Sequence, residues 1–132
     1  MASSVAAQDW QAIHELIARA YRAFDAGDAD DYVSLWIDDC KFLGFGDPIE
    51  GKEGLKGLCN GTLQQTGGKW RHHLTNTIVT ATGPLAARIE GLALVSCVGE
   101  TPSIQLIVDV RYDCQKIDGA WMLSGALIEI LN

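Results

Sequence analysis

The chain has 132 residues, of which 48% are hydrophobic and 20% charged, a composition typical of one folded domain spanning residues 1–132 and unlike that of a disordered chain. Seventeen acidic and ten basic residues give a net charge of −7 at pH 7, with no cluster of Lys and Arg. This charge pattern argues against nucleic acid or an anionic membrane as a partner, because both require a basic surface.

The cysteines and the N-terminal segment indicate the cellular compartment. The four cysteines are widely spaced and form no Cys-x-x-Cys pair, and the three histidines complete no zinc-binding spacing. We therefore expect free thiols, no metal and no cofactor. The first residues lack the basic and apolar regions of a signal peptide, and no apolar run is long enough to span a membrane. These features predict a soluble, cytoplasmic protein.

Helical periodicity marks the beginning of the chain. Apolar residues at three- and four-residue steps predict an amphipathic helix over residues 9–24, which Gly27 ends. Asp28, three residues before Asp31, resembles a helix N-cap. A short second helix, packed against the first as a hairpin, is then predicted from the pattern Tyr32, Val33, Trp36 and Ile37.

Strands dominate the second half of the chain. A short strand is expected over 40–46, then a turn, and then a helix over 52–65 that three glycines weaken by about 1 kcal/mol each. Long strands separated by turns are predicted at 70–80, 85–98, 104–117 and 120–131. Three helices before an antiparallel meander predict an α+β domain whose curved sheet wraps the helices and leaves an apolar pocket at its open end.

Two polar residues are candidates for chemistry in that pocket. Asp25 lies on the last turn of the first helix, near its core-facing stripe. In the segment WRHHLTN, strand alternation places His72 and Asn76 on the more apolar face, with Leu74 and Ile78. A neutral histidine there can act as a base near pH 7, and a carboxylate partner would fix its tautomer. By position alone, Asp25 also fits a turn residue and His72 a core histidine bonded to the backbone.

Aromatic residues near the helical hairpin have two interpretations. Tyr21 and Tyr32 could each donate a hydrogen bond to a substrate oxygen, and Trp36 could line the pocket. All three also fit the packing of the core. His73 has the opposite strand parity to His72, which places it at the surface or at a subunit interface unless a bulge reverses the parity.

Asp109 is a carboxylate within an apolar strand. Alternation places it on the same face as Ile107 and Arg111. It is therefore either a second polar group of the pocket or the partner of an ion pair with Arg111 or Arg88.

The pattern as a whole resembles the SnoaL-like branch of the nuclear transport factor 2-like superfamily. The resemblance rests on IARAYRAFDAGDADDYVSLWIDD in the hairpin, IEGKEGL at the third helix, WRHHLTN on the next strand and KIDGAWMLSG in the last hairpin. It implies a cone-shaped α+β barrel, with three N-terminal helices packed in a strongly curved mixed or antiparallel sheet. This fold hosts dehydratases, dehydrochlorinases, isomerases, epoxide hydrolases, polyketide cyclases and non-catalytic subunits.

Residue by residue, the resemblance implies a dyad. Asp25 matches the helix-end aspartate of scytalone dehydratase-like, bile-acid-dehydratase-like and hexachlorocyclohexane-dehydrochlorinase-like enzymes. His72, through its spacing to Asn76, matches the histidine that pairs with that aspartate. In those relatives the histidine removes a C–H proton while a leaving group departs from the adjacent carbon. The chain departs from them at Ala20, where a tyrosine is expected, although Tyr21 is adjacent.

These arguments predict a cofactor-independent lyase of the dehydratase type acting on a small, largely apolar substrate, with His72 as the general base and Asp25 orienting it. The substrate-binding candidates are Tyr21, Tyr32, Asn76, Trp36, Asp109 and His73. The alternatives are isomerisation, cyclisation or epoxide hydrolysis in the same pocket, or a non-catalytic ligand-binding or assembly module. The resemblance also implies a homodimer through the outer face of the sheet, a surface expected to include Thr75, Thr77 and Val79.

Overall fold

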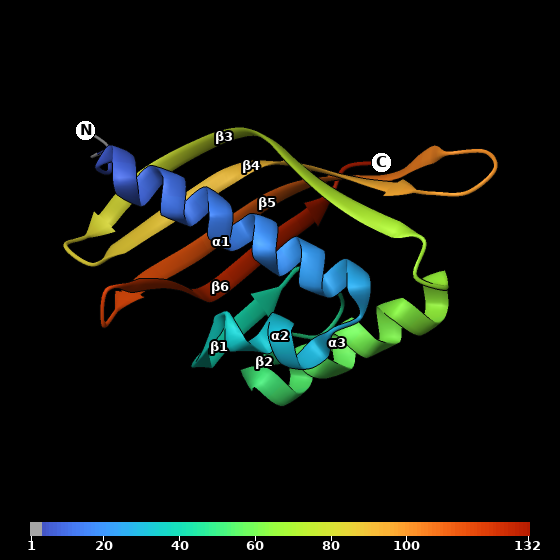
Figure 1. Cartoon of the computed structure of the whole chain (residues 1–132), viewed down its shortest axis with the longest axis horizontal. Coiled ribbons are helices and arrows are strands. Elements are labelled where there is room, and N and C mark those ends of the chain that lie inside the picture. Colours follow the sequence, from blue (N-terminus) through green and yellow to red (C-terminus); the bar gives the residue numbers. More distant parts are fainter. Residues whose placement is uncertain (1–3) are drawn as a thin grey trace.

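The computed structural model describes residues 4–132, in which three helices precede most of a six-stranded sheet (Figure 1). The helices are α1 (Ala7–Ala26), α2 (Ala29–Ser34) and α3 (Gly51–Thr66). The strands are β1 (Trp36–Leu43), β2 (Ile49–Glu50), β3 (Trp70–Gly83), β4 (Ala86–Cys97), β5 (Ser103–Ile117) and β6 (Ala120–Ile130). The predicted α+β class is confirmed.

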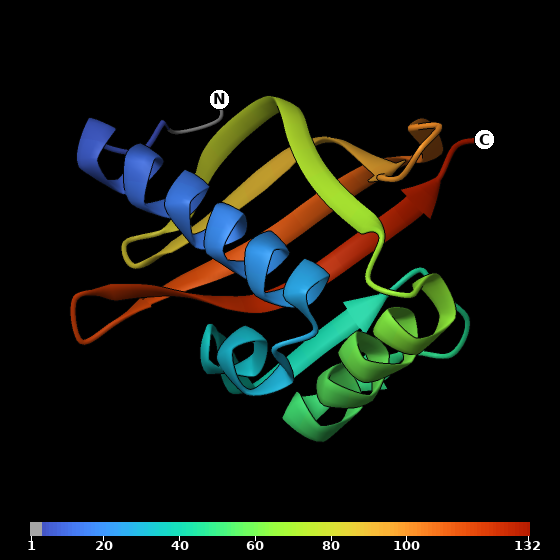
Figure 2. The same cartoon turned by 45° about the vertical axis from the view of Figure 1, so that its right-hand side comes forward.

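The sheet is mixed and curved, and it does not close. Its strand order is β2-β1-β6-β5-β4-β3, and every neighbouring pair is antiparallel except β1 and β6, which run parallel. Helix α1 lies across the concave face of the long strands, while α2 and α3 pack beside β1 at one end (Figures 1 and 2). The core therefore forms between α1 and the inner face of the sheet.

Helix α1 buries one stripe of its surface against the sheet. Ile13, Leu16 and Ile17 are among its buried residues, and their spacing is that of one helix face. Full burial of such side chains stabilises the fold by about 1.5–3 kcal/mol each. The helix ends at Gly27, whose φ of +71° is left-handed, and a Cβ there would lie 2.4 Å from Leu63 Cδ2.

The second helix is shorter than the sequence pattern predicts. The expected N-cap is present, because the Asp28 side chain accepts a hydrogen bond from Asp31 N at 3.1 Å. However, α2 ends at Ser34, and both Trp36 and Ile37 belong to β1, so their placement in the helix was wrong. The cause is parallel pairing with β6, where Trp36 lies opposite Leu123. Local periodicity carries no information about a partner so distant in the chain.

A bulge in β3 changes which side chains face the helices. Thr75 pairs with Leu92, but the next pair is Ile78 with Glu90, so β3 contains one extra residue there. Asn76 occupies the bulge with a φ of +55°. Alternation along β3 reverses beyond this residue, because a one-residue slip moves every following side chain to the other face.

The bulge overturns several expectations. Asn76 is exposed, and Ile78 is 67% exposed on the outer face, so neither points inward as predicted. Conversely, the Thr77 hydroxyl is hydrogen-bonded to His14 Nε2 of α1, with 2.8 Å between the two atoms, and Val79 packs against the core. Thr77 and Val79 therefore do not belong to the outer surface.

We predict that Gly91→Ala lowers the free energy of unfolding by about 1–3 kcal/mol. A Cβ at Gly91 would lie 2.8 Å from Thr75 O, so the backbone beside the bulge would have to shift. Urea unfolding measures the change. Gly83→Ala in the same sheet is the control, because a Cβ there comes no closer than 3.6 Å to Ala86, and it should change stability by less than about 0.5 kcal/mol. Equal stability of the two variants would contradict the prediction.

Candidate functional site

A cavity of about 600 Å³ lies between α1, α3 and the inner face of the sheet. Most of its wall is aromatic or aliphatic, as at Phe24, Phe42 and Val110. Polar atoms come mainly from Tyr21, Tyr32, Trp36, His72 and Tyr112, together with three polar residues of α3. No Lys or Arg occurs among the described residues that line it, so the cavity suits a largely apolar, uncharged ligand.

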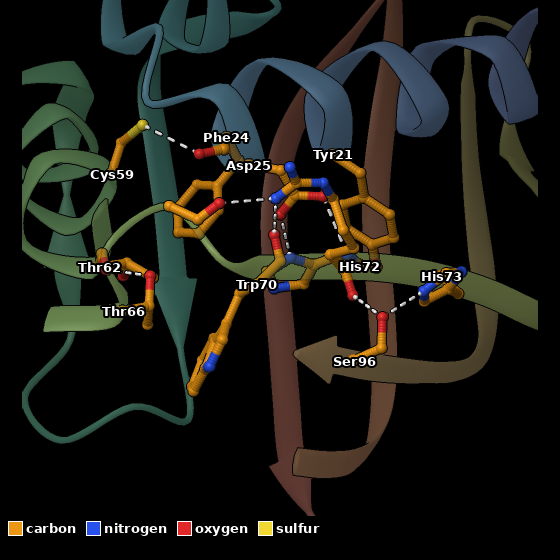
Figure 3. Close-up of polar contacts among 12 residues, drawn as sticks. Tyr21, Phe24, Asp25, Cys59, Thr62, Thr66, Trp70, His72, His73 and Ser96 are labelled. Carbon is orange, nitrogen blue, oxygen red and sulfur yellow. Dashed lines mark hydrogen bonds and ion pairs between the residues drawn. The ribbon is translucent and has the colours of Figure 1, made fainter. Parts of the chain in front are cut away.

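Asp25 contacts His72, which lines this cavity; Figure 3 shows the contact. Asp25 lies on the last turn of α1, and its Oδ1 is 2.6 Å from His72 Nδ1. Its other oxygen, Oδ2, accepts a hydrogen bond from the backbone N–H of His72 at 2.9 Å. The carboxylate therefore holds both the ring and the strand that carries it, with its side chain only 9% exposed.

The hydrogen bonds of Asp25 select one tautomer of His72. A carboxylate can only accept, so in the neutral ring Nδ1 carries the proton and Nε2 keeps a lone pair. Nε2 has no hydrogen-bond partner among residues 4–132, while the imidazole itself lines the cavity. The rings of Tyr21 and Phe24 lie 5.2 and 5.3 Å from the imidazole, centroid to centroid, and restrict its rotation. This arrangement can accept a proton from a bound molecule.

Two tyrosines form a second polar group in the cavity. The hydroxyls of Tyr21 and Tyr112 are 2.8 Å apart. Burial raises the pKa of Tyr112 to about 12, and burial also raises the pKa of Tyr21 and Tyr32 well above the ordinary value. All three hydroxyls are therefore neutral at physiological pH. When one hydroxyl of the pair donates to the other, the second keeps a hydrogen that it can donate to a ligand.

The structure divides the predicted site residues into two groups. Tyr21, Tyr32 and Trp36 line the cavity with His72. By contrast, Asn76 and Asp109 line a shallow groove on the outer face of the sheet, so both were wrongly placed in the pocket. His73 is exposed as well, and its Nε2 lies 2.8 Å from Ser96 Oγ.

Asp109 and Tyr112 illustrate strand alternation in β5. Val108, Val110 and Tyr112 are buried, whereas Asp109 between them is exposed. Tyr112 was not predicted as a site residue, although its position two residues after Val110 places it on the inner face. The expected ion pairs of Asp109 are not formed within the described chain, where Arg88 Nε instead contacts Asp113 at 2.9 Å.

Residues 4–132 contain neither a metal-binding cluster nor a membrane-spanning helix. No group of three or more His, Cys, Asp or Glu side chains in that range could hold a metal ion. No helix in the same range has the length and apolar character needed to cross a membrane.

A protein-family model matches most of the chain. Residues 5–125 match the model of the SnoaL-like domain. No curated protein matches the chain.

Solved structures show the same fold. One is a protein of unknown function with a cystatin-like fold from Nostoc punctiforme, 27% identical, with a TM-score of 0.86 over 99% of this chain and 96% of that one. Another is an NTF2-like protein with a cystatin-like fold from Novosphingobium aromaticivorans, 23% identical, with a TM-score of 0.81 over 95% of this chain and 83% of that one. A third, from Catenulispora acidiphila in complex with S-DNPA, is 20% identical, with a TM-score of 0.84 over 95% of both chains.

We predict that His72 is the Nδ1–H tautomer and that Asp25 causes this. Nitrogen-15 NMR above pH 8, where an imidazole is ordinarily neutral, should show a protonated Nδ1 with a downfield proton and an unprotonated Nε2 for this residue. Asp25→Asn should remove the downfield signal. Asp28→Asn is the matched control, because Asp28 caps α2 and its replacement should leave the Asp25–His72 pair intact. An Nε2–H tautomer in the native protein would refute this assignment.

Proposed function

The chain belongs to the SnoaL-like family, and from this membership together with the Asp25–His72 pair we propose that it is a cofactor-independent lyase of the dehydratase type. The SnoaL-like domain is a small-molecule-binding fold that is often enzymatic. The observation that carries the proposal is the 2.6 Å contact between Asp25 Oδ1 and Nδ1 of His72, a residue that lines an apolar cavity. The substrate is a small, largely apolar molecule.

The proposed reaction is a β-elimination. His72 Nε2 removes a proton from a carbon atom of the substrate, and the electrons of that C–H bond form a C=C bond as the leaving group departs from the adjacent carbon. Where the leaving group is a hydroxyl, the imidazolium returns the proton to it and water is released. Asp25 stabilises the imidazolium that exists between proton removal and proton return, since its carboxylate contacts Nδ1. General base catalysis of this kind contributes about 10²–10⁴-fold to a rate.

The tyrosines supply the complementary electrophilic group. Removing a proton next to a carbonyl places negative charge on the carbonyl oxygen, and a fixed donor stabilises this charge most in a site that excludes water. The Tyr21–Tyr112 pair lies in the wall of the same cavity and remains protonated because burial raises both pKa values. Tyr32 provides a third neutral hydroxyl there.

We predict that His72→Ala lowers the rate of dehydration by about 10²–10⁴-fold. The assay is a panel of β-hydroxy ketones, in which the appearance of the conjugated enone is followed by ultraviolet absorbance and the loss of one water by mass spectrometry. His73→Ala is the matched control, because it removes the neighbouring histidine from the outer face and should keep full activity. Circular dichroism checks that both variants are folded.

Three outcomes would contradict parts of this proposal. Full activity in folded His72→Ala would remove His72 from the reaction. A product of unchanged mass would indicate an isomerase or cyclase in this cavity, and a gain of one water would indicate an epoxide hydrolase.

We further propose that the chain forms a homodimer through the outer face of the sheet. The groove there is lined by Ile78 and Leu127, both exposed, and by several charged side chains. Arg111 Nε is buried in this groove without a hydrogen-bond partner in the described chain. On the same face, Asp109 lies opposite Glu129, and Arg111 lies opposite Glu90. In a two-fold symmetric dimer, the exposed Ile78 and Leu127 side chains of both copies would be removed from water.

Sedimentation velocity tests this interface. The native protein should sediment as a dimer and Ile78→Glu as a monomer, because a charge at a buried contact has no partner. Leu85→Glu is the control, since Leu85 is 61% exposed at the turn between β3 and β4 and should leave the dimer unchanged. A monomeric native protein would contradict this proposal.

A further inference from the structure

One wall of the cavity is a face of α3 that contains two glycines. Gly57 and Gly61 line the cavity together with Leu58, Thr62 and Gln65. Residues four apart lie on the same helix face, so Gly57, Gly61 and Gln65 form one row along this wall. At the two glycine positions, the surface facing the cavity is helix backbone.

Neither glycine is required by the fold. Both lie inside α3, and neither has a left-handed φ angle. A Cβ built at either position meets no atom within 4 Å. Gly54 in the same helix differs, because a Cβ there would lie 2.7 Å from Ile49 Cγ2. Since glycine weakens a helix interior relative to alanine, Gly57 and Gly61 reduce helix stability without relieving any contact.

Neutral hydrogen-bond donors form a second feature of this cavity. The Tyr21 and Tyr112 hydroxyls, 2.8 Å apart, belong to residues that line it, and one of the two keeps a hydrogen for a ligand. The fully buried Trp36 Nε1 makes no hydrogen bond of good geometry within residues 4–132 and interacts with the Tyr32 side chain, which opposes the rise that burial causes in the pKa of Tyr32. A ligand that carries a hydrogen-bond acceptor fits these donors.

We propose that Gly57 and Gly61 determine the width of the ligand that the cavity accepts. The absence of side chains at these positions lets a flat molecule lie against the backbone of α3. The ligand class is a neutral ketone, or a similar hydrogen-bond acceptor, wider than a single six-membered ring. The neutral character follows from the lining, which contains no Lys, Arg, Asp or Glu among the described residues. This inference rests on the proposed function, because it concerns the substrate of the same cavity.

Two neutral ketones of different width test the proposal by equilibrium binding. Prodan is a fluorescent naphthyl ketone, and para-dimethylaminoacetophenone has a single ring with the same two functional groups. In the double variant Gly57→Ala with Gly61→Ala, the Kd for prodan should rise about tenfold or more, because the added methyl groups occupy the space of the second ring. The Kd for the single-ring ketone should change by less than about twofold.

The same variant should also be more heat-stable than the native protein, since alanine favours a helix over glycine. Asn60→Ala is the matched control: Asn60 is exposed on α3 and does not line the cavity, so this change should raise helix stability without altering either Kd. A higher Tm with selectively weaker prodan binding is therefore the expected result, and it also excludes misfolding as the cause.

Three results would overturn the proposal: unchanged prodan binding in the double variant, an equal loss of binding for both ketones, or no binding of either ketone to the native protein. The readout is binding and not turnover. Loss of activity in His72→Ala therefore neither supports nor contradicts the role of the glycines, and a failure of this test leaves the role of His72 to be judged separately.

Discussion

The contact between Asp25 and His72 joins the two parts of the structure that form the site. One carboxylate at the end of α1 binds both the backbone N–H and the ring of a residue on β3. Because both bonds come from the same side chain, the position of the helix end and the orientation of the imidazole are fixed together. The tautomer of His72, the availability of Nε2 and the shape of this side of the cavity all depend on that constraint.

The cavity around this pair shows the balance between stability and function that is common in binding sites. Its apolar walls keep the hydroxyls of Tyr21 and Tyr112 neutral by raising their pKa, so the same burial that weakens them as acids preserves them as hydrogen-bond donors. Gly57 and Gly61 each reduce the stability of α3. The long buried stripe of α1 and the antiparallel strands compensate for these losses.

Errors in the sequence analysis had two physical causes. The first is non-local pairing: Trp36 fits the apolar period of a helix, but its pairing with β6 makes it the first residue of β1. The second is the bulge at Asn76, which reverses the alternation of β3 and moves Asn76 and Ile78 to the outer face. Asp109 was different, because the alternation of β5 held and already separated it from Val108 and Val110.

The sequence by itself determined the α+β class, the end of α1 at Gly27 and the association of Asp25 with His72 as candidates. These follow from periodicity, from turn residues and from family resemblance, which are all properties of short segments or of ordered motifs. Only the tertiary structure decided that a single carboxylate binds His72 twice, that Tyr112 joins Tyr21, and that Asn76 and Asp109 lie outside the cavity. Distances between segments depend on strand register and sheet curvature, which arise from the packing of the whole chain.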